Sequence, residues 1–327
     1  MSNTPNGFWD KLPKPFFALA PMADVTDAAF RRMFAKYGKP DVTWTEFVSA
    51  DGLCSPGREV LLRDFAYTEA ERPIVAQIFG ATPAHIEQVA TLIHELGFDG
   101  IDINMGCPDK SIEKQGAGAA MMKNPARALE VLAAAKQGAK GLPVSIKTRV
   151  GFNKIEIDSW IPKLLDARPA ALTIHARTRK EMSLVPARWE HVKEVVEMAK
   201  GTGVKIIGNG DVKSLEDGKV KAQETGADGI MIGRACFGNP WFFNPAIDHA
   251  TLPLKERFRV MIEHTKLFEE LLGDIKSFAI MKKHYKAYVN GFDGAKELRV
   301  KLMEAENADA IEHIIADFLE SDPTPAR

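Results

Sequence analysis

A cysteine in a tight turn is the first residue of this sequence whose setting suggests chemistry. The turn is Gly106-Cys107-Pro108, and the ring of Pro108 restricts the backbone directly after the sulfur. A thiol with an unperturbed pKa of about 8.5 is mostly protonated at neutral pH. Cys107 is therefore better suited to donate a proton than to act as a resting nucleophile, although most interior cysteines are only small apolar residues.

A lysine, Lys147, stands near the end of an apolar run at residues 143–148. A buried ammonium group is unfavourable unless something anionic faces it. The residues alone leave three interpretations open: a structural salt bridge, a Schiff-base lysine in an aldolase, or a cation beside the N1 and O2 edge of a flavin.

Two glycine-containing segments near the end of the apolar pattern indicate an anion site. They are Asn209-Gly210-Asp211 and Gly233-Arg234. Glycines let backbone N–H groups approach an anion, a helix N-terminus adds partial positive charge, and an arginine can supply a charge-assisted bond. Either segment alone could be a tight turn, but the pair predicts a phosphate-binding cup.

Four other polar residues follow or lie within apolar runs. His175 is close to Arg177, which favours contact with a cofactor or substrate over a purely structural role. Gln77 and Asn104 carry amides that can match the donor and acceptor edge of a planar heterocycle. Either amide could equally satisfy backbone groups of the fold.

Eight short apolar runs alternate with segments of helical periodicity, and this pattern predicts the elements that position these residues. We expect strands at residues 16–20, 42–48, 74–79, 100–104, 143–148, 171–175, 205–208 and 229–232, and helices at 83–96, 125–135, 189–200 and 214–224. The pattern is typical of a (β/α)8 TIM barrel, with a doubly wound open sheet as the rival. The active site of such a barrel lies at the carboxyl ends of its strands, where the polar residues above occur.

The pattern changes at residues 241–253, after which only helical signals remain. We therefore expect a barrel domain at 1–247 and a small all-helical domain at 254–327. Residues 275–301 hold seven Lys or Arg and two acids, whereas 302–322 hold seven acids and no Lys or Arg. One face of the helical domain should be basic, and Tyr285 is expected on it beside the lysines.

The overall composition excludes several classes of protein. With 43 Lys and Arg against 44 Asp and Glu in 327 residues, the chain is not a charge-driven nucleic-acid coat, so any nucleic-acid partner must meet a local patch. No apolar run approaches the ~18 residues of a membrane helix, and we expect a cytoplasmic protein without membrane contact. Its three cysteines are too far apart for a disulfide framework or a cysteine metal site, so we expect no metal.

At these residues the sequence resembles the tRNA-dihydrouridine synthase family. The matching stretches are Ala20-Pro21-Met22-Ala23-Asp24-Val25-Thr26-Asp27, Asn104-Met105-Gly106-Cys107-Pro108-Asp109-Lys110, Gly116-Ala117-Gly118-Ala119, Ser145-Ile146-Lys147-Thr148-Arg149, His175-Ala176-Arg177-Thr178, Asn209-Gly210-Asp211 and Gly233-Arg234. The Asn-x-Gly-Cys-Pro segment combined with the lysine is the most specific part. In the tail the match is looser, through residues 282–286 and 297–299.

The resemblance implies an FMN enzyme that reduces the C5=C6 bond of uridines in the D-loop of tRNA and uses NADPH to reload the flavin. Cys107 would protonate C5 after flavin N5 delivers hydride to C6. The residues expected to bind the cofactor are Pro21, Met22, Gln77, Lys147, His175, Asn209, Gly210, Asp211, Gly233 and Arg234. The residues expected to bind the substrate are Asn104, which would face the uracil, with Arg149, Arg177, Lys282, Lys283 and Lys286.

The sequence departs from the family pattern at positions that border the substrate in the family. Residues 183–185 are Ser-Leu-Val where many members carry an aromatic residue and a glycine, Arg188 replaces a common acid, and Asp24 stands where glycine is usual. Three alternatives to the tRNA enzyme remain open. They are a flavin dehydrogenase acting on a free pyrimidine, of the dihydroorotate or dihydropyrimidine type, a phosphosugar aldolase that uses Lys147 as a Schiff base, and a non-catalytic RNA-binding barrel.

Overall fold

The computed structural model describes residues 6–321, in which eight parallel strands form one sheet in the order β1-β8-β7-β6-β5-β4-β3-β2. The strands are β1 (Phe16–Leu19), β2 (Thr43–Ser49), β3 (Ile74–Phe79), β4 (Gly100–Met105), β5 (Val144–Arg149), β6 (Ala171–His175), β7 (Lys205–Asn209) and β8 (Gly229–Ile232). The two edges meet where Ala18 forms a parallel bridge with Val42 and the Leu19 N–H donates to the Val42 carbonyl oxygen at 3.2 Å. The predicted (β/α)8 barrel is confirmed, and the open sheet is not.

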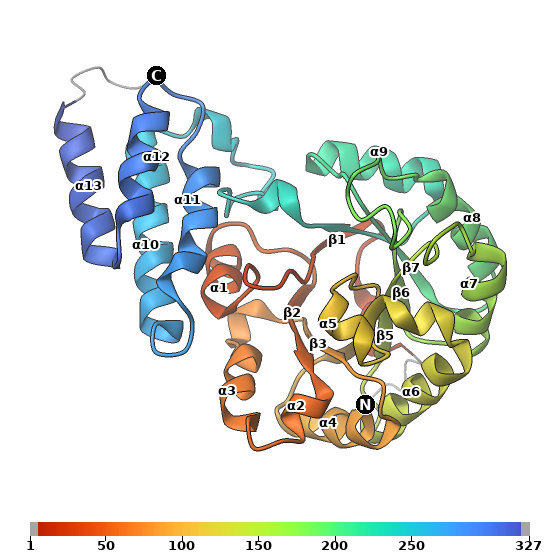
Figure 1. Cartoon of the computed structure of the whole chain (residues 1–327). Coiled ribbons are helices and arrows are strands. Elements are labelled where there is room, and N and C mark those ends of the chain that lie inside the picture. Colours follow the sequence, from red (N-terminus) through yellow and green to blue (C-terminus); the bar gives the residue numbers. More distant parts are fainter. Residues whose placement is uncertain (1–5, 322–327) are drawn as a thin grey trace.

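Helices surround the barrel, and a group of C-terminal helices lies beside it (Figure 1). The barrel region contains α1 (Ala28–Tyr37), α2 (Ala50–Leu53), α3 (Arg58–Leu62), α4 (Pro83–Glu95), α5 (Lys110–Lys114), α6 (Pro125–Gly138), α7 (Ile157–Asp166), α8 (Glu190–Ala199) and α9 (Leu215–Thr225). The C-terminal group contains α10 (Leu254–Leu272), α11 (Lys282–Tyr288), α12 (Ala295–Glu304) and α13 (Ala308–Ser321). The predicted helices α4, α6, α8 and α9 are present with ends close to those expected.

Residues of each strand alternate between the barrel interior and the surrounding helices. In β4, Ile101, Ile103 and Met105 belong to the large apolar core that includes the helices, whereas Asp102 and Asn104 occupy the alternate positions. Since successive side chains of a strand point to opposite faces, both polar residues face the interior. The same alternation on β5 brings interior polar groups towards the carboxyl ends of the strands.

The amino-terminal end of the barrel interior is filled by aromatic side chains. Trp9, on the 3-10 helix η1 (Gly7–Lys11), is 2% exposed. Its ring centroid lies 5.7 Å from those of Phe16 and Trp44. Within the part of the chain that the structure describes, the barrel interior is therefore open at the opposite end.

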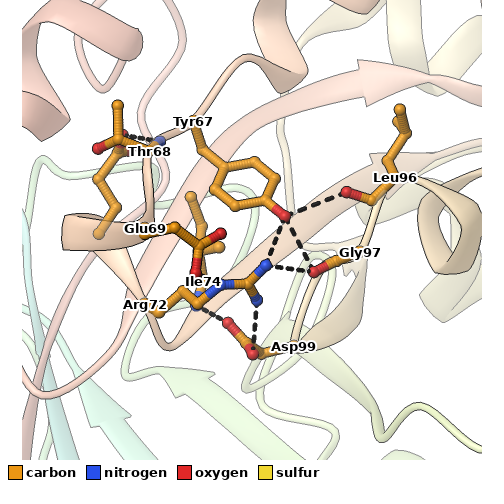
Figure 2. A network of polar contacts seen from close by, with 9 residues as sticks. Tyr67, Thr68, Glu69, Arg72, Ile74, Leu96, Gly97 and Asp99 are labelled. Carbon is orange, nitrogen blue, oxygen red and sulfur yellow. Dashed lines mark hydrogen bonds and ion pairs between the residues drawn. The ribbon is translucent and has the colours of Figure 1, made fainter.

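A polar network fixes the loops at the same amino-terminal end (Figure 2). The Arg72 guanidinium donates to Glu69, to Asp99 at 2.8 Å and to the Gly97 carbonyl oxygen. The Tyr67 hydroxyl accepts from Arg72 at 2.7 Å, and the other Asp99 carboxylate oxygen accepts the Ile74 N–H at 2.8 Å. This network ties the starts of β3 and β4 together.

Helix α1 lies between the barrel and the C-terminal helices. Ala29 is buried in one apolar cluster with residues of all four C-terminal helices. The Phe30 ring centroid is 5.7 Å from that of His264 on α10 and 5.3 Å from that of His284 on α11. The two regions therefore share a continuous apolar contact through α1.

The expectation that Tyr285 is exposed on a basic face is wrong. Tyr285 is fully buried in the cluster of C-terminal helices, and its hydroxyl accepts a hydrogen bond from Thr265 at 3.3 Å. On a helix, residues three or four positions apart share a face, so Tyr285 packs inward with Tyr288 while Lys286 is exposed.

The carboxyl group of Asp27 caps the start of α1. Its Oδ1 accepts the Phe30 N–H at 2.9 Å, while its Oδ2 is buried without a hydrogen-bond partner. Burial raises the pKa of Asp27 to about 7, against the opposing hydrogen bond from Phe30, and the charge of Glu46 adds to the increase. In a substantial fraction of the molecules, this carboxyl group is therefore protonated near pH 7.

Within residues 6–321, none of the helices combines the length and the apolar character that crossing a membrane requires. The cytoplasmic location expected from the sequence stays a prediction.

Candidate active site

A cavity of about 290 Å³ lies at the carboxyl ends of the strands and collects most of the predicted site residues. Those that line it are Pro21, Met22, Asn104, Cys107, Lys147, Arg149, His175, Arg177, Asn209, Gly210, Asp211, Gly233 and Arg234. Gln77 is fully buried and lies behind Asn104, to which its side-chain carbonyl is bonded. Lys282, Lys283 and Lys286 lie on α11, outside the lining.

Several lining residues were not anticipated from the sequence. Phe47 comes from β2 and Met231 from β8. Val212 and Ala235 follow the two glycine segments. The apolar residues gave no sequence signal, because apolar side chains at strand ends usually belong to the core.

The backbone around Cys107 is held from two sides. The Cys107 N–H donates to the Asn104 side-chain oxygen at 2.9 Å, and the Cys107 carbonyl oxygen accepts the Ala119 N–H at 2.9 Å. A Cβ at position 118, where the glycine has φ of +59°, would lie 2.9 Å from that carbonyl oxygen. Burial raises the pKa of the Cys107 thiol, so the sulfur keeps its proton at neutral pH.

The ammonium group of Lys147 lines the cavity without a hydrogen-bond or ion-pair partner among residues 6–321. Burial lowers the pKa of Lys147 to about 8, and the neighbouring charge of Arg149 lowers it further, opposed by the charges of Asp102 and Cys107. No structural salt bridge occupies Lys147, so the first of its three interpretations is not supported. The cavity wall therefore has a cation available to an anionic group.

Two buried arginines connect the strand ends to the loop that follows β6. Arg149 donates to the carbonyl oxygens of Gly106 at 2.7 Å and Met182 at 3.0 Å. Arg177 donates to the Val185 carbonyl oxygen at 2.6 Å and also forms an ion pair with Asp211. Both arginines line the cavity, but most of their N–H groups donate hydrogen bonds to protein atoms.

His175 is a neutral acceptor in this structure. Its Nε2 lies 3.2 Å from Nη1 of Arg177, which can only donate, so Nε2 carries no proton. Burial, together with the positive charges of Lys147 and three arginines, lowers the pKa of His175 well below its usual value. The other ring nitrogen, Nδ1, is then the protonated one.

The charges around the cavity are unbalanced towards positive. Lys147, Arg149, Arg177 and Arg234 line it, against the single lining acid Asp211. Arg234 donates to Asp211 at 2.6 Å, and its side chain is 61% exposed, so it can reach an incoming group. The hydrogen bond from Arg177 lowers the pKa of Asp211. An anionic ligand is favoured here over a cationic one.

Glycines make room on the same side of the cavity. A Cβ at position 233 would lie 3.1 Å from the sulfur of Met22, and Gly210 has φ of +134°, which side chains rarely adopt. The Trp189 indole N–H donates to the Gly210 carbonyl oxygen at 2.9 Å and fixes this turn. Glycine backbone, an exposed arginine and a lysine without a partner among the described residues fit the phosphate and the polar ring edge of a flavin nucleotide.

The unusual Asp24 lies in the loop that continues from Pro21 and Met22. Its φ is +53°, a left-handed conformation that explains why glycine suits this position. The Asp24 N–H donates to Glu46 at 2.5 Å, and its carbonyl oxygen accepts from Lys283 of α11 at 2.8 Å. The C-terminal helices therefore contact a loop that lines the cavity.

The unusual residues after β6 form the rim of the cavity. Ser183 lines the cavity and Leu184 is 86% exposed. Arg188 donates to both carboxylate oxygens of Glu181, at 2.8 and 2.6 Å, so the arginine that replaces a common acid has an acidic partner in the same loop. Residues 6–321 contain no group of three or more His, Cys, Asp or Glu side chains arranged to hold a metal ion.

Comparisons with known proteins agree with the motifs. A family model described as "Dihydrouridine synthase (Dus)" matches residues 18–321. "Probable tRNA-dihydrouridine synthase 2" of Bacillus subtilis (strain 168) is 39% identical over 319 residues, covering 95% of this chain and 96% of that protein. "Probable tRNA-dihydrouridine synthase" of Staphylococcus aureus (strain COL) is 38% identical over 319 residues, covering 95% of each chain.

Among solved structures, a mutant morphinone reductase in complex with tetrahydroNAD is similar in fold. It has a TM-score of 0.50 and 13% sequence identity, covering 69% of this chain and 85% of that one. At this identity the similarity concerns the fold alone. The family model and the relatives extend into the C-terminal helices. This chain therefore belongs to the dihydrouridine synthase family.

Proposed function

We propose that this protein is an FMN-dependent tRNA-dihydrouridine synthase, which reduces the C5=C6 bond of a uridine in the D-loop of tRNA with NADPH as the reductant. One observation carries the proposal: a protonated thiol, Cys107, and an unpaired ammonium, Lys147, line the same cavity. An enzyme that adds a hydride and a proton to a uracil ring needs both a cofactor site and a proton donor.

The cofactor is assigned to the positive side of the cavity. Lys147 would face the polar edge of the isoalloxazine ring, and Pro21 and Met22 would pack beside the ring. The ribityl phosphate region would be held by residues around the two glycine segments: His175, Asn209, Gly210, Asp211, Gly233 and Arg234. The Asp211 carboxylate would act through the arginines with which it forms ion pairs. A direct ring contact by Gln77 would require Asn104 to release the Gln77 carbonyl oxygen, so we assign Gln77 to holding Asn104.

When bound and reduced, the flavin supplies a hydride to C6 of the uracil. Cys107 then transfers its thiol proton to C5, and the resulting thiolate takes up a proton from solvent before the next turnover. The raised pKa of Cys107 suits this task, because the thiol is protonated at neutral pH. Asn104 is assigned to the uracil, with Arg149 and Arg177 shaping the rim next to it.

The tRNA is assigned to the basic surface of α11. Lys283 and Lys286 are exposed, Lys282 is half-buried, and Lys283 reaches the Asp24 loop beside the cavity. Lysines at this place can follow the phosphates of a folded RNA while one base is extruded into the cavity. We therefore propose residues 1–247 as the catalytic barrel domain and 254–327 as the tRNA-binding domain.

Replacing Cys107 by alanine tests the proposal. We expect Cys107→Ala to bind FMN and tRNA with wild-type affinity but to form dihydrouridine at least about 100-fold more slowly, the size of effect expected for a general acid. Nucleoside analysis of tRNA after reaction measures the product. Wild-type rates in the variant would remove Cys107 from the chemistry.

The family assignment does not favour the alternative of a free-pyrimidine dehydrogenase. An aldolase with a Schiff base on Lys147 would bind no flavin, so the absorption spectrum of the purified protein separates it from our proposal. Because α1 shares its apolar contact with the C-terminal helices, substitution of surface lysines is a cleaner test of RNA binding than deletion of those helices.

A further inference from the structure

A chain of hydrogen bonds inside the barrel links a buried carboxylate to the backbone of Cys107. The Gln77 amide nitrogen donates to Oδ2 of Asp102 at 2.6 Å, and the Asn104 amide nitrogen donates to Oε1 of Gln77 at 3.0 Å. The Asn104 oxygen then accepts the N–H groups of Gly106 at 3.1 Å and Cys107 at 2.9 Å. The first two links join the neighbouring strands β3 and β4, on which Gln77 is in register with Asp102, and the last lies within the turn after β4.

The carboxylate determines the direction of every bond in this chain. An ionised carboxylate can only accept, so the NH2 group of Gln77 must point at Asp102 and its oxygen at Asn104. The NH2 group of Asn104 is thereby directed to Gln77, which leaves its oxygen for the turn at Cys107. With a neutral amide in place of Asp102, both side-chain amides could reverse, and the Asn104 NH2 would face two N–H donors.

We propose that Asp102 is a positioning residue that fixes the Cys107 turn through Gln77 and Asn104. The inference rests on the proposed function only in taking Cys107 as the proton donor. Asp102 itself lies below the cavity and does not line it.

The surroundings of Asp102 support a functional reason for its charge. It is fully buried in the barrel, a place where a carboxylate is costly, and its Oδ1 accepts a second bond from Ser145 at 2.6 Å. Burial raises the pKa of Asp102 to about 6, opposed by its hydrogen bonds and the charge of Lys147, so it is ionised above neutral pH. Among the described residues, no charged group lies within ion-pair distance of Asp102, and Lys147 acts on it only from further away.

Three variants of the flavin-loaded enzyme test this chain. Asp102→Asn removes the directing charge, and Gln77→Met interrupts the chain without changing charge. The double variant Asp102→Asn with Gln77→Glu restores direction, because a carboxylate at position 77 accepts from the amides at 102 and 104. Ser145→Ala is the matched control, since it removes a bond to the same carboxylate outside the chain.

The primary measurement is the alkylation rate of Cys107 as a function of pH, resolved by peptide mass spectrometry, with Cys54 in the same sample as an internal reference. At high pH, where the thiol is fully ionised, the alkylation rate of Cys107 reaches a plateau. A loosened turn should raise this plateau rate at least about threefold in Asp102→Asn and Gln77→Met. The plateau rate of the double variant should return towards that of the wild type, and the rate of Ser145→Ala should equal it.

The variants that change the alkylation rate of Cys107 should also change the rate of turnover. We expect kcat for dihydrouridine formation to fall about 10-fold or more in Asp102→Asn, with KM for tRNA within about twofold, because a misplaced reacting group affects the chemical step. If Asp102→Asn unfolds, the comparison of Gln77→Met with Ser145→Ala decides the question.

Three results would overturn the inference: unchanged plateaus in both single variants, an equal change in Ser145→Ala, or a shift in the thiol pKa at constant plateau, which would indicate a charge effect alone. The outcome does not depend on the tRNA reaction. If the wild-type enzyme forms no dihydrouridine, the proposed function fails while the alkylation rates still decide the role of Asp102.

Discussion

The buried carboxyl of Asp27 should make the stability of this protein fall as pH rises through neutrality, and Asp27→Asn should remove that dependence. Its pKa rises from the usual 3.8 to about 7 in the folded protein, mainly because burial disfavours the charged form. Between these two values the folded state holds a proton that the unfolded state has lost. The free energy of unfolding contributed by this group therefore decreases as pH increases from 3.8 to about 7.

The size of the effect follows from the two pKa values. One proton of difference changes the free energy of unfolding by about 1.4 kcal/mol per pH unit, and the span is roughly three units, which gives roughly 4 kcal/mol in total. Between pH 7.5 and 5.5 the folded group takes up most of its proton, while the unfolded group stays almost fully ionised. Over this interval we expect about 2 kcal/mol.

Urea unfolding of the wild type and of Asp27→Asn at pH 5.5, 6.5 and 7.5 measures this contribution. Asparagine caps helices as well as aspartate does, so the bond to Phe30 is retained. All other titrating groups are common to both proteins and cancel in the difference. The wild type should gain about 2 kcal/mol relative to the variant on going from pH 7.5 to 5.5.

A difference between the two proteins that stays constant with pH would refute the reasoning, because it would mean that Asp27 keeps an ordinary pKa when folded. A difference that grows in the opposite direction would mean that the carboxylate is stabilised by Arg31 or Lys276 more than it is destabilised by burial.

Two further predictions concern the cofactor and the RNA. Lys147→Met should weaken FMN binding about 10-fold or more, measured by fluorescence titration, because a charge-assisted contact is lost. Burial lowers the pKa of Lys147 to about 8, so flavin reduction by NADPH should slow in wild type as pH rises through 8 and should not follow this profile in the variant. The double variant Lys283→Ala with Lys286→Ala should lower the slope of log K for tRNA binding against log salt concentration by about two. The control variant Lys219→Ala on α9 should leave this slope unchanged. Equal slopes in the wild type and both variants would argue against α11 as the RNA surface.

The barrel could be predicted because each strand is a short apolar run and each intervening segment has helical periodicity. Thirteen of the predicted site residues line one cavity because they follow strand ends, which meet at one end of a barrel. Asp102 was missed although a lone acid in the apolar run of β4 is a visible signal. Alternation along the strand would have placed it inside, below Asn104.

Other features depend on contacts that no local pattern reveals. The loop that includes Ser183 is held by Arg149 and Arg177, which come from different strands. Tyr285 was misjudged because a run of lysines around it suggested an exposed face. Helical periodicity separates it from Lys286, and its neighbours in the buried cluster come from distant helices.

The aromatic side chains around Trp9 and Trp44 close one end of the barrel, so within residues 6–321 the cavity opens at the carboxyl ends of the strands. Under the proposed function, the reductant and the extruded nucleotide would reach the flavin through this same opening. They would therefore have to bind in turn, and reduction of the cofactor would be separated in time from reduction of the RNA.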